Sequence, residues 1–133
     1  MYSKGNINAL DQLCSSDIRL IDAASPNFKG GLAAYKEYEM AYKTAFPAKN
    51  MKIDEIYCTD DSDSRVVVRW TCKAAHKGNL VDLPPTGKNV TVSGISIYHI
   101  ANGKITEITQ SWDRLGLLEQ IGEVETSVAA LHR

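Results

Sequence analysis

Apolar and polar residues alternate along the second half of the chain, as they do in β-strands whose two faces meet different surroundings. Residues 90–112, VTVSGISIYHIANGKITEITQSW, hold two such runs on either side of Asn102-Gly103. Asn-Gly between strand-like runs favours a tight hairpin turn, because both central residues need a positive φ. We therefore predict a long antiparallel hairpin that forms the floor of a pocket in a curved sheet.

A two-residue turn determines which side chains share a face of this hairpin. Unbroken pairing places Ile100 opposite Ile105 and Tyr98 opposite Glu107. One face then carries Ser96, Tyr98, Glu107, Thr109, Ser111 and Asp113, and the other carries Ile95, Ile97, His99, Ile108, Gln110 and Trp112. In this register His99 and Asp113 lie on opposite faces, so that they meet only through a β-bulge or a shifted register.

The first half of the chain carries helical as well as strand-like patterns. Apolar spacing predicts a first helix within residues 6–15, and a stripe of rings predicts a second over residues 32–46, where Pro47 ends it. That stripe consists of Tyr35, Tyr38, Tyr42 and Phe46. Strands are predicted over residues 17–24, 51–58 and 65–76, and a short helix follows Asp113 and ends near Gly122.

Helices followed by a run of strands indicate the α+β class. We expect a roll in which helices pack on the concave face of a curved, mainly antiparallel sheet. Residues 1–122 form a single domain in this prediction, and residues 123–133 form a tail that is flexible or weakly helical. The acidic turn over residues 60–64 lacks the Gly and the closing Glu of a calcium loop.

The overall composition excludes several classes of partner. Fifteen basic and sixteen acidic residues give a net charge of −1, and no basic cluster points to nucleic acid. No apolar run is long enough to cross a membrane, and the N-terminus does not resemble a signal peptide. Three widely spaced cysteines indicate free thiols. We therefore expect a cytoplasmic protein that binds neither nucleic acid nor membrane.

The candidate chemistry centres on Asp113. The chain has no Gly-rich phosphate loop, no paired metal ligands and no nucleophile elbow, so we expect neither a cofactor nor a metal. Asp113 lies between Trp112 and a leucine-rich helix, where burial would raise its pKa and suit it to acid/base catalysis. The alternative is that Asp113 caps the helix that begins at Arg114, a favoured role for Asp.

Other residues are candidates for a supporting role around this acid. His99 and His76 are possible polar partners, although His99 is equally consistent with an ordinary strand residue. Arg69 could bind an anionic or carbonyl group, or form a cross-strand salt bridge, for instance with Glu107. The rings of the predicted cavity wall are Trp70, Trp112, Tyr38 and Phe46; the alternative for the helical stripe is plain core packing.

Several segments together resemble the SnoaL-like polyketide cyclases, also described as ester cyclases, within the nuclear transport factor two-like superfamily. They are Ala45-Phe46-Pro47, Val67 to Thr71, His76-Lys77-Gly78, Pro84 to Lys88, Gly103 to Glu107 and Trp112 to Gly122. The resemblance implies a cone-shaped roll with an apolar cavity and a homodimer formed through the sheet. It also implies a cofactor-free intramolecular aldol cyclisation, with Asp113 as acid/base and His99 as its neighbour.

Two function hypotheses follow. The first is a cofactor-independent enzyme in which Asp113 transfers a proton on a small, mostly apolar carbonyl compound. The second is a non-catalytic module for ligand binding or dimerisation, and an isomerase, dehydratase or hydrolase on the same scaffold is a further alternative. A pocket of roughly a few hundred Å³ that contains Asp113 would favour the enzyme. A filled core with Asp113 capping the last helix would favour the module.

Overall fold

The computed structural model describes residues 7–59 and 64–122. Residues 60–63 of the predicted acidic turn and the tail at residues 123–133 lie outside the described residues. No helix in the described part of the chain combines the length and the apolar character that crossing a membrane requires.

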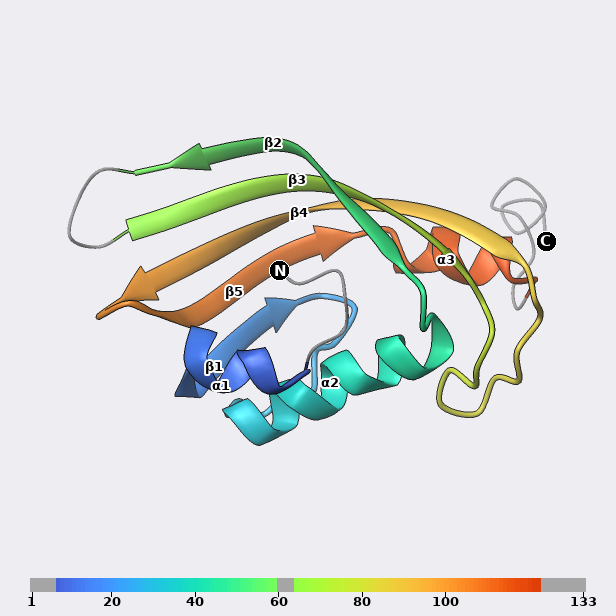
Figure 1. Cartoon of the computed structure of the whole chain (residues 1–133), viewed down its shortest axis with the longest axis horizontal. Helices are drawn as coiled ribbons and strands as arrows, with labels where there is room; N and C mark the ends of the chain where they lie inside the picture. The colour runs from blue at the N-terminus through green and yellow to red at the C-terminus, as the bar shows by residue number, and fades with distance from the viewer. Residues whose placement is uncertain (1–6, 60–63, 123–133) are drawn as a thin grey trace.

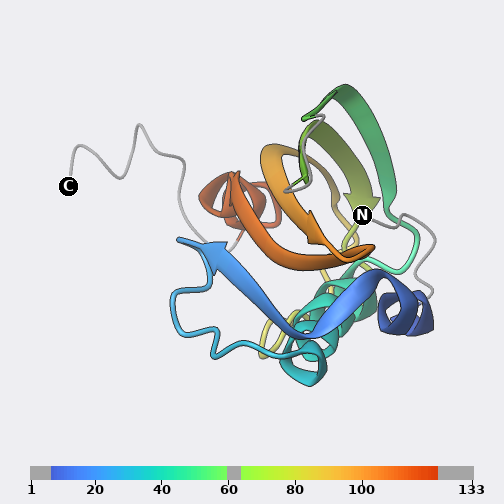
Figure 2. The ribbon, with the colours of Figure 1, turned by 90° about the vertical axis from the view of Figure 1, so that its left-hand side faces the viewer.

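Five strands form one curved sheet that arches over the helices (Figure 1). The elements in chain order are η1 (Ile7–Ala9), α1 (Leu10–Leu13), β1 (Cys14–Asp22), α2 (Leu32–Ala45), β2 (Asn50–Cys58), β3 (Ser64–Ala75), β4 (Asn89–Ala101), β5 (Lys104–Trp112) and α3 (Arg114–Gln120). The sheet order is β1-β5-β4-β3-β2; β1 runs parallel to β5 and the other three pairs are antiparallel. The predicted α+β class with a mainly antiparallel sheet is confirmed. Figure 2 shows β1 and α2 side by side below the rest of the sheet.

The first helix is shorter than predicted, because the chain enters the sheet at Cys14. Cys14 pairs with Ile105 of β5 and is 1% exposed. Ile18, Leu20 and Asp22 then point inward at two-residue steps. Cys14 and Ser15, which the apolar spacing assigned to the helix, thus belong to β1 instead.

The hairpin between β4 and β5 has the predicted turn but not the predicted register. Asn102 and Gly103 adopt φ values of 54° and 76° and connect the pair Ala101–Lys104. Ile100 lies opposite Ile105 as expected, but the next pair is His99 with Glu107, so Thr106 forms a bulge. The extra residue reverses the facing of the rest of β5 relative to β4.

In the described part of the chain the buried core forms three clusters: two lie at the two ends of α2, and the third consists of Val68, Trp70 and Cys72 on β3. Tyr35 packs near the start of the helix with Leu10, Ile18 and Ile108. Phe46, just beyond its end, packs with Leu80, Val90, Leu117 and Ile121. Between these clusters the middle of α2 faces the sheet across an open space.

Candidate functional site

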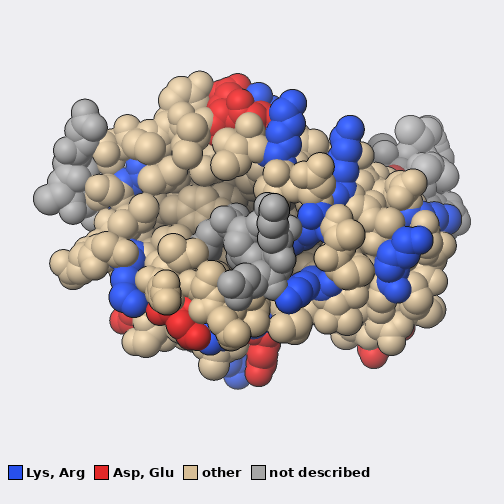
Figure 3. Space-filling view, in the orientation of Figure 1, with Lys and Arg blue, Asp and Glu red and all other residues tan. Residues whose placement is uncertain are grey.

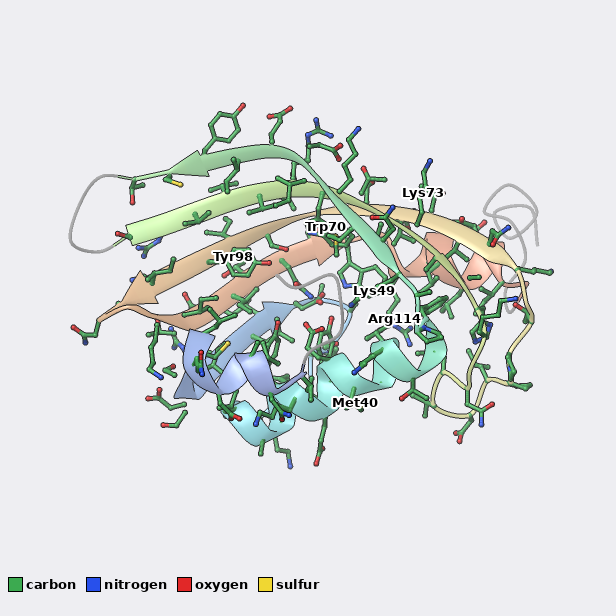
Figure 4. The ribbon with its side chains drawn as sticks, in the orientation of Figure 1. Met40, Lys49, Trp70, Lys73, Tyr98 and Arg114 are labelled. Atoms are coloured by element: carbon green, nitrogen blue, oxygen red, sulfur yellow. The ribbon has the colours of Figure 1, made fainter. Side chains whose placement is uncertain are left out.

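This open space is a pocket of about 400 Å³ between α2 and the concave face of the sheet. Its aromatic lining comprises Tyr35, Tyr38, Tyr42, Phe46, Trp70, Tyr98 and Trp112. Figure 4 shows Trp70 and Tyr98 in the space below the sheet, whereas Met40 points away on the far side of α2. The surface is hollowed between the sheet and the helices (Figure 3). All four ring residues predicted for the cavity wall lie in its lining.

Strand alternation brings the two tryptophans into this lining. Trp70 on β3 is 9% exposed, and its Nε1 donates to Ser96 Oγ at 2.9 Å. Gly94 lies opposite both Trp70 and Trp112 in the sheet. A Cβ at Gly94 would lie 2.6 Å from Trp70 Cζ2 and 2.7 Å from Trp112 Cβ. The absence of a side chain at Gly94 therefore lets both rings approach β4.

A row of rings connects α2 to β5. The centroids of Tyr35 and Tyr38 lie 6.0 Å apart, those of Tyr38 and Tyr42 5.4 Å, and those of Tyr42 and Trp112 5.6 Å. Burial raises the pKa of Tyr38 well above its usual value near 10, and it also raises the pKa of Tyr98. Both hydroxyls therefore keep their protons at neutral pH and can donate to a ligand.

A buried carboxylate supports the polar groups at one side of the pocket. Asp22 is 6% exposed and lies opposite Gln110 in the β1–β5 pair. Its Oδ2 accepts from Gln110 Nε2 at 2.7 Å and Trp112 Nε1 at 3.1 Å, and its Oδ1 accepts from Ala24 N at 2.8 Å. Gln110 Nε2 also donates to the Tyr38 hydroxyl at 2.9 Å. Gln110, Trp112 and Tyr38 line the pocket, and Asp22 lies behind them.

A second set of interacting polar side chains connects α2 to Lys49, the residue directly before β2. Glu39 Oε1 accepts from the Tyr35 hydroxyl at 2.8 Å, and Glu39 Oε2 lies 3.9 Å from Lys49 Nζ. The side chains of Glu39 and Lys49 are 16% and 14% exposed, and both line the pocket. Figure 4 shows Lys49 beneath the sheet. Among the described residues that line the pocket, Glu39 is the only carboxylate.

The prediction that Asp113 is buried in this pocket is wrong. Asp113 is exposed, does not line the pocket and forms the N-cap of α3, where its Oδ1 accepts from Gly116 N at 2.8 Å. The strand ends at Trp112, and the turn into α3 directs the carboxylate to the helix N-terminus, where an acceptor satisfies an unpaired backbone N–H. Asp113 therefore caps α3, as the alternative interpretation expected. A catalytic role of Asp113 stays an untested prediction.

The alternation of side chains along β4 decides the position of His99. His99 lies between Tyr98 and Ile100 on β4, and both of these neighbours line the pocket. His99 therefore faces the opposite side of the sheet, where Glu107 and Arg65 are its partners in the ladder. The structure brings His99 and Asp113 neither together nor into the pocket.

His76 and Arg69 also lie outside the pocket lining. His76 is fully buried, its ring lies 5.3 Å from that of Phe46, and its Nδ1 is 3.1 Å from Thr86 Oγ1. Arg69 is exposed and binds Glu55 Oε1 through Nε at 3.1 Å and Nη2 at 2.9 Å. The cross-strand salt bridge expected of Arg69 thus forms with Glu55, whereas Glu107 pairs with Arg19.

Sequence reasoning missed Asp22, Glu39 and Gln110. Asp22 continues the inward alternation of Ile18 and Leu20, so an acidic residue at a core position was a usable signal. Glu39 follows Tyr35 by one helical turn, which places a charge beside the aromatic stripe. Gln110 was placed correctly on the face of Trp112, but its partner on β1 was not visible in the sequence.

Residues 7–59 and 64–122 contain no group of three His, Cys, Asp or Glu side chains that could hold a metal ion.

The chain is similar to proteins of one family. The model of the SnoaL-like polyketide cyclases matches residues 1–121. A protein from Acidithiobacillus ferrooxidans, provisionally named a polyketide cyclase, is 31% identical, with a TM-score of 0.75 over 90% of this chain and 84% of that one.

Two further solved structures share the fold at lower identity. TsrD from Streptomyces laurentii is 20% identical, with a TM-score of 0.77 over 92% of this chain and 87% of that one. A SnoaL-like polyketide cyclase from Agrobacterium tumefaciens is 18% identical, with a TM-score of 0.65 over 87% and 85% of the two chains. No protein with a curated description matches.

Proposed function

Since the chain belongs to the SnoaL-like polyketide cyclase family, we propose that it is a cofactor-independent enzyme that transfers a proton on a small, mostly apolar carbonyl compound. The observation that carries this proposal is the presence of one carboxylate and one ammonium group, Glu39 and Lys49, inside an aromatic pocket. The pocket volume of about 400 Å³ suits a compound of two or three fused rings or an open chain of similar size.

Glu39 is the proposed base. Oε1 is occupied by the Tyr35 hydroxyl, whereas Oε2 has only the 3.9 Å contact with Lys49 among the described residues. Oε2 would take the proton from the carbon next to the carbonyl. The resulting enolate oxygen would be stabilised by the Lys49 ammonium group, an interaction strengthened by the low dielectric of the pocket.

In a cyclisation the enolate carbon would then attack a second carbonyl of the same molecule. A carbon–carbon bond forms, the carbonyl π bond breaks, and the new alkoxide takes a proton, which Glu39 can return. This sequence is balanced without an oxidant or a reductant. It assigns to Glu39 the task that the sequence reading gave to Asp113.

Deuterium exchange at the α-carbon of 2-tetralone in D₂O tests the proton transfer without the natural substrate. The wild type should accelerate the exchange, which NMR follows, and Glu39→Gln should lower the rate about 100-fold. Glu37→Gln is the matched control, because Glu37 is exposed on the same helix and does not line the pocket.

Asp113→Asn distinguishes the two candidate carboxylates. If Asp113→Asn abolishes exchange and Glu39→Gln does not, the base is Asp113 and the assignment to Glu39 is wrong. Exchange that survives in Asp113→Asn but not in Glu39→Gln supports Glu39.

The second candidate function is a non-catalytic ligand-binding module. Its supporting observation is that Asp113, the residue matched to the family's acid, is an exposed helix cap. Binding of 2-tetralone by the wild type without any accelerated exchange would favour the module. The homodimer through the sheet and the cytoplasmic location stay predictions.

A further inference from the structure

We infer that Asp22 is a positioning residue that fixes the orientation of the Gln110 amide, and that the pocket consequently recognises a hydroxyl group on its ligand, such as an enol or a phenol. The inference deepens the proposed function, because it rests on a ligand occupying the same pocket. It concerns recognition and is independent of which carboxylate moves the proton.

The chemistry of the carboxylate determines which end of the Gln110 amide faces it. An ionised carboxylate only accepts hydrogen bonds, so the amide atom 2.7 Å from Asp22 Oδ2 is the nitrogen. The second hydrogen of this nitrogen is directed to the Tyr38 hydroxyl oxygen at 2.9 Å. Both amide hydrogens of Gln110 are therefore already bonded, one to Asp22 behind the pocket wall and one to Tyr38 within it.

The amide oxygen of Gln110 is the part of the head group that remains for a ligand. No donor among the described residues is bonded to Gln110 Oε1. Trp112 offers nothing further, since its single N–H already donates to Asp22. Gln110 thus presents an acceptor to the pocket.

Tyr38 supplies a donor beside this acceptor. Its oxygen accepts from Gln110, and among residues 7–59 and 64–122 its own proton has only Asp22 Oδ2 at 3.5 Å, beyond the usual range of an O–H···O bond. Because burial keeps the hydroxyl protonated, it can donate to a ligand. An acceptor and a donor held side by side fit a hydroxyl, which donates and accepts through one oxygen, whereas a ketone or an ether cannot donate.

Asp22 is what keeps this arrangement in one orientation. A flipped Gln110 would direct its oxygen at the carboxylate, and the two acceptors would repel each other. In Asp22→Asn, which has nearly the same shape, an NH₂ group at the position of Oδ2 tolerates a flipped Gln110 and gives up the bond from Trp112 Nε1. The pocket of this variant would then lose its preference for a donor.

The test is the ratio of the dissociation constants of 2-methoxynaphthalene and 2-naphthol, measured by NMR titration of ¹⁵N-labelled protein. In the wild type 2-naphthol should bind about tenfold more tightly. The ratio should fall to near one in Asp22→Asn and in Gln110→Met. Asp17→Asn is the matched control, because Asp17 lies on the same strand but is exposed, and it should keep the wild-type ratio.

Each outcome supports or overturns the inference. A folded Asp22→Asn with an unchanged ratio, or a wild type without preference, overturns it and leaves the proposed function standing. If neither probe binds, the inference fails together with the proposed pocket ligand. If Asp22→Asn does not fold, an NMR pH titration of the wild type replaces it. The Gln110 side-chain amide resonances should then move as the Asp22 carboxyl takes up a proton. Resonances that stay fixed overturn the pairing of Asp22 with Gln110.

Discussion

Asp22 and Asp113 stand at the ends of two neighbouring strands, yet they have opposite environments. Strands β1 and β5 run in parallel, and Asp22 is the last residue of β1 while Asp113 directly follows β5. The two residues therefore lie toward the same end of the two strands. Asp22 is 6% exposed and accepts three hydrogen bonds of 3.1 Å or less from described residues, whereas Asp113 is exposed and accepts one, from Gly116.

The difference shows that a carboxylate is buried when it lies on the inward face of a strand. Apolar neighbours in the sequence do not decide this. Asp22 still belongs to the strand and points to the same side as Leu20 and Ile18. Asp113 has left the strand, and Leu115 beyond it is 55% exposed. Trp112 contributes its N–H to Asp22 instead of covering Asp113.

Removing the buried carboxylate should have the largest effect on stability. Asp22→Ala leaves the donors of Gln110, Trp112 and Ala24 without their acceptor, and we expect the free energy of unfolding to fall by about 3 kcal/mol. Urea denaturation followed by tryptophan fluorescence measures this loss. A loss below that of Asp113→Ala would contradict the contrast between the two sites.

Removing the exposed cap should cost less. Asp113→Ala loses the acceptor for Gly116 N, and we expect a fall of about 1 kcal/mol in the same urea experiment. Asp113→Asn should change little, because Asn caps helices as well as Asp does. Equal losses for Ala and Asn would show that the charge of Asp113, and not its capping oxygen, is what matters.

A further effect should appear only at alkaline pH. The pKa of Tyr38 is raised in the folded protein, so its contribution is present below the ordinary value near 10 and is lost as the pH rises above it. Between about pH 9 and 11, the free energy of unfolding should decline less steeply in Tyr38→Phe, by at most about 1.4 kcal/mol per pH unit. Denaturation series at several pH values measure the slope, and identical slopes would contradict a buried Tyr38 hydroxyl.

Much of the fold could be predicted because it is written in local periodicity. The stripe from Tyr35 to Phe46 predicted α2, and alternation around Trp70 predicted both β3 and its inward face. The Asn102-Gly103 turn was predicted from its need for positive φ. These features depend on residues that are close in the chain.

The candidate site could be predicted only in part. The pocket walls followed from the same periodicities, but the bulge at Thr106 is a property of two strands pairing, and it moved Gln110 and Trp112 to the face of the hairpin opposite His99. Asp22 and Gln110 are far apart in the chain and meet only because β1 adds to the sheet in parallel beside β5.

The sequence by itself determined the elements, the hairpin turn and the rings that surround the pocket, because backbone preference and amphipathic spacing act over a few residues. Only the tertiary structure decided which carboxylate is buried, which amide it orients and where Glu39 meets Lys49. Those contacts depend on strand order and register, which arise when distant segments exclude water from one another.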